Sequence, residues 1–276
     1  STRALYERNM EKLVLPVFAS YTLREISVRK VDQFLKKLAS TKSYSTAKQA
    51  RTVLSLAFGL AVRYDAIREN PVRDAARLHK PPSQTMSLTL EQVEAIRHAT
   101  RNWRRGPGVP GPPPDGQLEQ IIEIMLGTSA RIGEVLAIRR CDVDVTVSPA
   151  TVRICGTIVS PAGKPTYRQP HPKTQKSTRV VSVPSFAAEV IRERLVVVGQ
   201  EDPEHLLFFT RNGTPLTTNN IRRRLRAVLA DAGIEGVTPH AFRRTVATVL
   251  DRASGPDLAA ELLGHSSSKI TKEHYI

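Results

Sequence analysis

A short stretch near one third of the way along the chain divides the sequence into two parts. Residues 79–87 read HKPPSQTMS, with two adjacent prolines, several polar residues and no helical or strand periodicity. Such a composition predicts an extended linker. Because 276 residues exceed the usual size of a single domain, we expect a first domain at 1–80, a linker at 81–87 and a second domain at 88–276.

The first domain reads as a small all-helical unit. Ser27 is placed to cap a helix in which Val31, Phe34, Leu35 and Leu38 recur at helical spacing. One face of this helix is apolar and the other carries lysines, which is typical of a helix that packs in a bundle.

Two further helices complete the predicted unit. Ser43 or Ser45 opens a longer helix rich in alanine and leucine, and an earlier helix is expected at about 5–17. The Asn70-Pro71 pair is expected to end the segment that follows the longer helix, because the residue before a proline disfavours helical backbone.

The second domain combines helices with a few strands. Thr89 and Gln92 form a capping box for a helix. The β-branched segments 151–159 and 178–183 flank the turn-forming sequence SPAGKP, which predicts a small antiparallel sheet, and a further helix is expected at 219–230. The predicted fold class is mainly α with a small antiparallel β-sheet, an N-terminal helical domain preceding an α+β domain.

The charge of the chain restricts its partners. Lysine and arginine number 41 against 26 aspartates and glutamates, which gives a net charge of +15 and a pI near 10.3. Residues 1–87 alone hold 16 basic and 7 acidic residues. This excess favours a polyanionic partner, with nucleic acid as the first candidate and a DNA-clamping role for the first domain. A ribosomal or generic RNA-binding surface is the alternative that charge leaves open.

Eight basic side chains on predicted helices are candidates for DNA contacts. Each of them alone is equally compatible with an ordinary solvated helix face. The candidates are Arg8, Lys12, Lys42, Lys48, Arg51, Arg222, Arg223 and Arg224.

Several common chemistries have no support in the sequence. The segment SPAGKPT lacks the upstream glycine of a P-loop, no GxGxxG follows a predicted strand, and no His, Cys and carboxylate set has metal-ligand spacing. We therefore expect no metal and no cofactor.

Cys141 and Cys155 form no CxxC pair, and no run approaches about 18 apolar residues. These features predict a cytoplasmic protein with no membrane partner.

A series of polar side chains in the second domain remains to be explained. They follow one another as an R-x-x-E motif, a lysine between the two predicted strands, an H-x-x-R motif, an L-G-H motif and a late tyrosine. The residues are Arg131, Glu134, Lys173, His240, Arg243, His265 and Tyr275.

In this order the motifs resemble those of the tyrosine recombinases, the phage integrase family, and the resemblance covers nearly the whole chain. It implies a helical core-binding domain followed by a catalytic domain, and an integrase of a phage or integrative element. The activity implied is site-specific cleavage and rejoining of DNA through a 3′-phosphotyrosine and a Holliday junction. The partners implied are double-stranded DNA attachment sites, a homotetramer on DNA, and a DNA-bending host factor or excisionase.

Elementary chemistry gives the same set a coherent role. Attack on a phosphodiester builds charge on the non-bridging oxygens, and arginine forks stabilise that charge, so we interpret Arg131 and Arg243 as a phosphate clamp. A tyrosine with a pKa near about 10 needs nearby cations or a proton acceptor, which the clamp and His240 supply to Tyr275. No ATP or metal is required for ligation.

The resemblance assigns the remaining roles. Lys173 would protonate the leaving oxygen, His265 would donate to a non-bridging oxygen, and Glu134 would orient Arg131. Tyr275 lies ten residues after His265, whereas in several members the tyrosine falls nine residues later.

His274 holds the position nine residues after the L-G-H histidine, but Tyr275 is the only tyrosine beyond Tyr167, so the nucleophile assignment stays with Tyr275. Alternatives stay open at two of the other assignments. Lys164 or Lys176 replaces Lys173 if the hairpin register differs, and Arg244 competes with its neighbour in the H-x-x-R motif.

Two other functions compete with recombination. One is a type IB topoisomerase-like enzyme, which would share the chemistry and relax supercoils as a monomer. The other is a non-catalytic DNA-binding protein that retains the fold. Relative to many integrases the sequence lacks an arm-binding domain and a C-terminal tail; if it is a piece of a longer protein, we expect that protein to extend beyond it at both ends.

Overall fold

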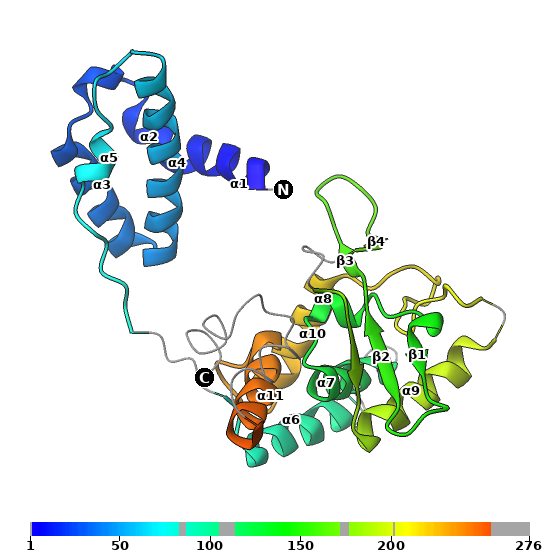
Figure 1. Ribbon diagram of the computed structural model, residues 1–276. Coiled ribbons are helices and arrows are strands. Elements are labelled where there is room, and N and C mark those ends of the chain that lie inside the picture. Colours follow the sequence, from blue (N-terminus) through cyan, green and yellow to red (C-terminus); the bar gives the residue numbers. More distant parts are fainter. Residues whose placement is uncertain (1, 83–86, 105–113, 172–176, 201, 255–276) are drawn as a thin grey trace. The chain divides into compact units, whose positions relative to one another are not determined.

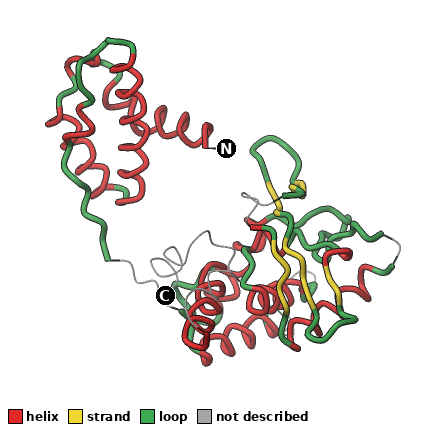
Figure 2. The backbone as a smooth tube through the Cα atoms, in the orientation of Figure 1, coloured by secondary structure: helices red, strands yellow, loops and turns green. Residues whose placement is uncertain are grey.

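The computed structural model separates into two compact units, Ser1–Gln84 and Thr85–Ile276. The structure describes residues 2–82, 87–104, 114–171, 177–200 and 202–254 (Figures 1 and 2).

All regular secondary structure in the described part of the N-terminal unit is helical. The first helical stretch contains a π-helical turn, and the two longest helices, α3 and α4, pack side by side. The elements are α1 (Thr2–Asn9), the π-helical turn Met10–Val14, α2 (Leu15–Phe18), a 3-10 turn Leu23–Glu25, α3 (Val28–Thr41), α4 (Tyr44–Arg63) and α5 (Pro71–Asp74).

Serine caps begin both long helices. The Ser27 hydroxyl accepts from the Lys30 amide at 3.4 Å, and the Ser43 hydroxyl accepts from the Thr46 amide at 3.1 Å. The second bond identifies Ser43, rather than Ser45, as the cap of α4. All four apolar positions predicted for α3 are buried, so its predicted face is confirmed.

The Asn70-Pro71 pair ends the turn segment that follows α4, as predicted, and it also begins α5, with Asn70 in an extended conformation. The Asn70 carboxamide oxygen accepts from the Val72 amide at 3.0 Å, while its nitrogen donates to the Ser55 carbonyl at 3.0 Å. Proline at the first helical position has no amide hydrogen that needs a partner, so an Asn-Pro pair serves equally well as a helix start.

Aromatic and aliphatic side chains from several helices form the core of the N-terminal unit. The Phe18 and Phe34 rings meet edge to face with centroids 5.1 Å apart. Leu35 and Leu54, from α3 and α4, and Phe58 from α4 are at most 2% exposed. This core fixes the helices that carry the basic side chains of the unit.

The C-terminal unit combines helices with two small antiparallel sheets. Helix α7 (Gln117–Thr128) is apolar on most of its surface and packs against five other helices. The elements around it are α6 (Leu90–Asn102), α8 (Ile132–Val135), a 3-10 turn Arg140–Asp142, α9 (Ser185–Val198), α10 (Thr218–Asp231) and α11 (Pro239–Ser254). The predicted capping box of α6 at Thr89 and Gln92 is present, with both of its hydrogen bonds.

The strands form a three-stranded and a two-stranded sheet. The order in the first is β1-β2-β5, with Val152 of β2 opposite Val143 of β1 and Val181 of β5. The second pairs β3 with β4 and places Ile158 opposite Arg168. The strands are β1 (Val143–Asp144), β2 (Thr151–Ile154), β3 (Thr157–Val159), β4 (Tyr167–Gln169) and β5 (Arg179–Ser182).

The predicted antiparallel pairing of segments 151–159 and 178–183 is confirmed by β2 and β5, and segment 151–159 forms two strands, β2 and β3. Cys155 and Gly156 interrupt it, and the SPAGKP turn joins β3 to β4 rather than leading directly to β5. The Arg168 guanidinium packs against the backbone at the interruption, where a Cβ on Gly156 would lie 2.6 Å from its Nη2. The same guanidinium donates to the Ala137 carbonyl at 2.8 Å, which ties the β3–β4 hairpin to the unit.

Close packing around α7 fixes the backbone that leads into the candidate site. A Cβ on Gly127 would lie 2.4 Å from the Cβ of Ala187, so α7 and α9 can approach this closely only with glycine there. Across the described ranges, no helix has both the length and the apolar character needed to cross a membrane.

Candidate active site

Arg131 lies in the connection between α7 and α8. Helix α7 ends at Thr128, and Ser129 adopts a left-handed backbone with a φ of 55° while its amide donates to the Met125 carbonyl at 2.9 Å. Ser129 and Ala130 are buried, so the backbone that carries Arg131 is held in place. The Arg131 side chain itself is 45% exposed. A cation on a fixed backbone that solvent can reach is suited to bind an anion.

Glu134 joins two arginines at this position. Its buried carboxylate accepts from the Arg131 amide at 3.0 Å, from Arg131 Nη1 at 2.9 Å and from Arg179 Nη2 at 3.3 Å. Burial alone would raise the pKa of Glu134, but the charge of Arg179 and the hydrogen bonds from Arg131 outweigh it and lower the pKa. The ionised carboxylate therefore holds both guanidinium groups in position.

Arg243 approaches the same connection from helix α11. Its side chain is fully buried, and Nη1 donates to the Ser129 carbonyl at 2.6 Å. The neighbouring Arg244 is only half-buried. Of these two arginines, Arg243 is the one that the fold directs toward the backbone beside Arg131.

His240 lies one turn before Arg243 at the start of α11. Burial lowers the pKa of His240, and the positive charges of Arg243, Arg244 and Arg131 lower it further. The imidazole is therefore neutral at pH 7, which leaves one ring nitrogen able to accept a proton.

The structure brings Arg131, Glu134, His240 and Arg243 together from two distant parts of the chain. The other predicted catalytic residues, Lys173, His265 and Tyr275, lie outside the described residues, as does Lys176, an alternative to Lys173. Lys164 is exposed in the turn between β3 and β4. The assignments to these residues stay predictions.

Arg179 is a residue of this site that the sequence analysis missed. It begins β5, its side chain is 9% exposed, and burial lowers its pKa although Glu134 opposes that effect. The available signal was its position, a single arginine at the start of an otherwise apolar β-branched run. Only the folded structure, in which Arg179 reaches Glu134 of α8, shows that it shares a carboxylate with Arg131.

A second buried ion network, also missed, lies around Asp142. Arg139 donates two hydrogen bonds from its side chain to this carboxylate at 2.8 and 2.9 Å, and Arg153 Nη2 and Cys155 Sγ lie at 3.1 and 3.2 Å. Burial raises the pKa of Asp142, but the hydrogen bonds from Arg139 and Cys155 prevail and lower it to about 2. With Arg168 Nη2 at 3.5 Å, this network links the 3-10 turn to both sheets.

The predicted DNA-contact residues differ in their surroundings. Arg8, Lys12, Lys42, Lys48, Arg222 and Arg223 are exposed. Arg51 instead donates to the carbonyls of Val72, Ala75 and Ala76 at 2.8 to 3.2 Å, and Arg224 lies 3.3 Å from both carboxylate oxygens of Asp115. These last two side chains have partners within their own units.

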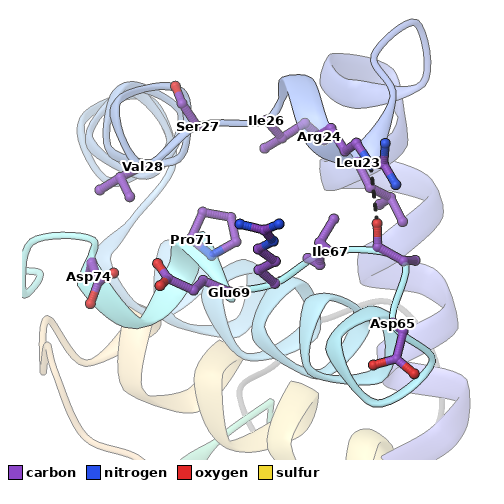
Figure 3. Close-up of a pocket in the computed structure, with 12 residues that line it drawn as sticks. Leu23, Arg24, Ile26, Ser27, Val28, Asp65, Ile67, Glu69, Pro71 and Asp74 are labelled. Atoms are coloured by element: carbon purple, nitrogen blue, oxygen red, sulfur yellow. Dashed lines mark hydrogen bonds between the residues drawn. The ribbon is translucent and has the colours of Figure 1, made fainter.

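A pocket of about 660 Å³ lies in the N-terminal unit, away from any predicted site residue. Figure 3 shows Asp65, Glu69 and Asp74 around it, with Arg24 donating to a backbone carbonyl, that of Ala66, at 3.4 Å. Its lining carries both signs of charge, so it offers no phosphate site of the kind the catalytic set requires. Within the described residues, no group of three His, Cys, Asp or Glu side chains is placed to hold a metal ion.

The comparison with protein families identifies the unit that carries this site. The family model for the phage integrase family matches residues 86–276. The chain belongs to the phage integrase family. The match includes Arg131, Glu134, Arg179, His240 and Arg243, so the clustered residues all lie in the integrase domain.

Curated relatives extend the similarity over the N-terminal unit. An integrase of Streptomyces ambofaciens is 27% identical over 285 residues, covering 96% of this chain and 68% of the relative. Tyrosine recombinase XerD of Corynebacterium glutamicum is 26% identical, covering 99% of this chain and 86% of the relative. The chain spans 62% of a XerC-like tyrosine recombinase of Caldanaerobacter subterraneus.

Solved structures of integrases share the fold. The Tn1549 transposon integrase in complex with transposon right end DNA matches with a TM-score of 0.79 and 23% identity, covering 100% of this chain and 89% of that one. A lambda integrase dimer bound to a COC′ core site matches with a TM-score of 0.73 and 18% identity, covering 100% and 71%. The predicted family, the enzyme class it implies and the mainly helical fold with small antiparallel sheets are thus confirmed.

Proposed function

We propose that this integrase-family chain is a site-specific DNA recombinase that cleaves and rejoins double-stranded attachment sites through a tyrosine. The observation that carries the proposal is the convergence of Arg131, Glu134, His240 and Arg243 at the α7–α8 connection. Family membership supports the same reaction.

The two arginines serve as the phosphate clamp. The Arg131 guanidinium is half-exposed and oriented by Glu134, while Arg243 is fixed by the Ser129 carbonyl. Fixed cationic donors stabilise the charge that grows on the non-bridging oxygens as phosphorus becomes five-coordinate. Because both groups are already held in place, little reorganisation is needed when the transition state forms.

The proton movements involve His240 and two side chains assigned from the sequence. The hydroxyl of Tyr275 attacks phosphorus and forms a 3′-phosphotyrosyl bond, while neutral His240 accepts the tyrosine proton. The bond to the 5′ oxygen breaks, and Lys173 gives that oxygen a proton. His265 donates to a non-bridging oxygen. Rejoining reverses these steps with the 5′ hydroxyl of another strand.

The remaining parts of the proposal concern assembly and place. The N-terminal unit is the core-binding domain and contacts DNA through exposed side chains such as Lys48. Four protomers act on two duplexes through a Holliday junction, in the cytoplasm, with a DNA-bending host factor or an excisionase as accessory partner. One neighbour in the fold comparison is a lambda integrase tetramer bound to a Holliday junction, with a TM-score of 0.69.

Covalent capture tests the proposed reaction directly. Duplexes of randomised sequence, each with a nick that lets the released strand diffuse away, are incubated with the chain and denatured. We expect a protein–DNA adduct that can be sequenced, and we expect Tyr275→Phe to abolish it. Arg131→Ala should bind DNA and lose about 100-fold or more of the cleavage rate. Adduct formation by Tyr275→Phe would refute the assignment of the nucleophile.

A further inference from the structure

A cleft of the integrase domain, separate from the candidate active site, has the composition of a ligand site. It has a volume of about 500 Å³ and lies where the end of α6, the start of α7, the turn at 210–213 and helix α10 meet (Figure 1). This volume is within the range of small-molecule sites. None of Arg131, Glu134, His240 and Arg243 lines it.

A single large aromatic ring forms part of the lining. Trp103 follows the last turn of α6, and its indole nitrogen donates to Asp231 of α10 at 3.0 Å. The ring is half-buried against the core. An indole that is fixed at one edge and partly accessible provides a rigid surface on which a flat ring can stack.

Three arginines from different elements line the same cleft. Arg104 follows α6, Arg211 lies in the 210–213 turn and Arg224 lies on α10. Asp115 is the one carboxylate among the lining residues, and it lies 3.3 Å from Arg224. Asp115 therefore faces both Arg211 and Arg224, which leaves an excess of positive charge suited to a phosphate.

Two further features strengthen this field. Arg194 is 5% exposed, its charge interacts with Asp115, and its buried Nη2 has no hydrogen-bond partner in the described part of the chain. Arg104 adopts a left-handed backbone with a φ of 53°, a conformation that disfavours residues with a Cβ. Such strain is typically retained at functional positions. The Arg104 guanidinium lies over the Trp103 ring, 5.8 Å from its centroid.

We propose that this cleft binds one nucleotide, with the phosphate between Arg211 and Arg224 and the base against Trp103. Duplex DNA keeps its bases stacked inside the helix and offers only its backbone to such a cleft, whereas a free nucleotide or an unpaired one presents both groups. The shared chemistry is a phosphate joined to an accessible base. The proposal does not depend on the recombination chemistry, because the two sites share no residue among those described.

Intrinsic fluorescence provides a direct test on the full chain. Trp103 is the only tryptophan of the sequence, so stacking on it changes the whole tryptophan signal. Four probes are titrated: a deoxynucleoside 5′-monophosphate, inorganic phosphate, a short single-stranded oligonucleotide and a hairpin duplex. Arg211→Gln is the test variant, since its residue is exposed in a turn. Arg192→Gln, at an exposed position of α9 outside the cleft, is the matched control.

We expect the monophosphate, the single strand or both to quench the signal, with an affinity that falls about tenfold in Arg211→Gln and is unchanged in Arg192→Gln. Quenching by the single strand alone identifies an unpaired nucleotide of DNA as the natural ligand, and quenching by the monophosphate identifies a free one. Calorimetry with Trp103→Ala, in which the stacking surface is missing, should show a further loss of about tenfold.

Three results would overturn the proposal. The first is the absence of quenching by either nucleotide probe at millimolar concentration. The second is competition by inorganic phosphate with the same affinity as the monophosphate, which would make the cleft a simple anion site. The third is equal binding of the hairpin duplex with the same dependence on Arg211, which would make it a backbone contact. Melting temperatures of the variants close to that of the parent chain exclude misfolding as the cause of a loss.

Discussion

Arg243 Nη1 donates to the carbonyl oxygen of Ser129 at 2.6 Å, across 114 residues of sequence. Ser129 lies two residues before Arg131 and adopts a left-handed backbone conformation. The bond therefore joins the backbone segment that carries Arg131 to the side chain of Arg243, the other arginine of the clamp. A shift of α11 relative to α7 would strain this hydrogen bond and so disturb the positions of both cations. The geometry of the clamp therefore depends on the packing of the domain core.

The first prediction concerns the choice between the two neighbouring arginines of α11. Arg243→Lys keeps the charge but loses the planar fork that reaches the Ser129 carbonyl and a phosphate together. We expect the rate of covalent adduct formation to fall about 100-fold or more, while DNA binding in a gel-shift assay changes little. Arg244→Lys serves as the matched control. An equal loss of rate in both variants would contradict the assignment.

The second prediction concerns Glu134, which shares its carboxylate between two arginines. Glu134→Gln leaves Arg131 and Arg179 without their common anion, so the free energy of unfolding should fall by about 3 kcal/mol in urea titrations. Glu119→Gln removes the partner of Arg101, which is 62% exposed, and should cost less than about 1 kcal/mol. Comparable losses in the two variants would show that the shared carboxylate has no special structural role.

The third prediction concerns the protonation of His240. Its pKa is lowered by burial and by three arginines, so its NMR titration midpoint should lie below the usual value of about 6.5. Because the folded state disfavours the imidazolium, the stability it contributes is present above that value and is lost as the pH falls. Arg131→Gln should raise the midpoint, and Arg140→Gln should leave it in place. A midpoint above 6.5 in the parent chain would remove His240 as a proton acceptor at neutral pH.

The fourth prediction concerns acid stability. The pKa of Asp142 is lowered to about 2, so its ionised form contributes about 2 kcal/mol above pH 4, and this contribution is lost as the pH falls toward 2. The difference in unfolding free energy between the parent chain and Asp142→Asn should therefore shrink between pH 5 and pH 2.5. A difference that does not vary with pH would mean that the folded carboxyl titrates normally.

The fifth prediction separates two basic residues on successive turns of α4. Lys48 is exposed, whereas the Arg51 guanidinium donates to carbonyls at the end of α5. Lys48→Ala should weaken DNA binding and make the salt dependence shallower by about one phosphate contact, with an unchanged melting temperature. Arg51→Ala should instead lower the melting temperature. The reverse pattern would assign the DNA contact to Arg51.

Much of this protein could be predicted because its signals are local. The caps at Ser27 and Thr89 need only the next three residues, and the buried face of α3 follows from helical spacing, so these features were predicted correctly. The order of the Arg131, His240 and Arg243 motifs pointed to the family without any coordinates. Local signals said less where the chain changes direction, as in segment 151–159, where the β-branched pattern does not show the interruption at Cys155 and Gly156.

The tertiary structure decided what depends on residues that are distant in sequence. Arg179 and Glu134 are 45 residues apart, and they share a hydrogen bond only because the fold brings the start of β5 to Glu134. In the same way the partners of Arg51 and the neighbours of Asp142 come from separate elements. The sequence by itself determined the helical pattern, the family and the kinds of side chain available for chemistry. Which of those side chains converge, and which are already paired, was decided by packing, because contact energies act between neighbours in space rather than in sequence.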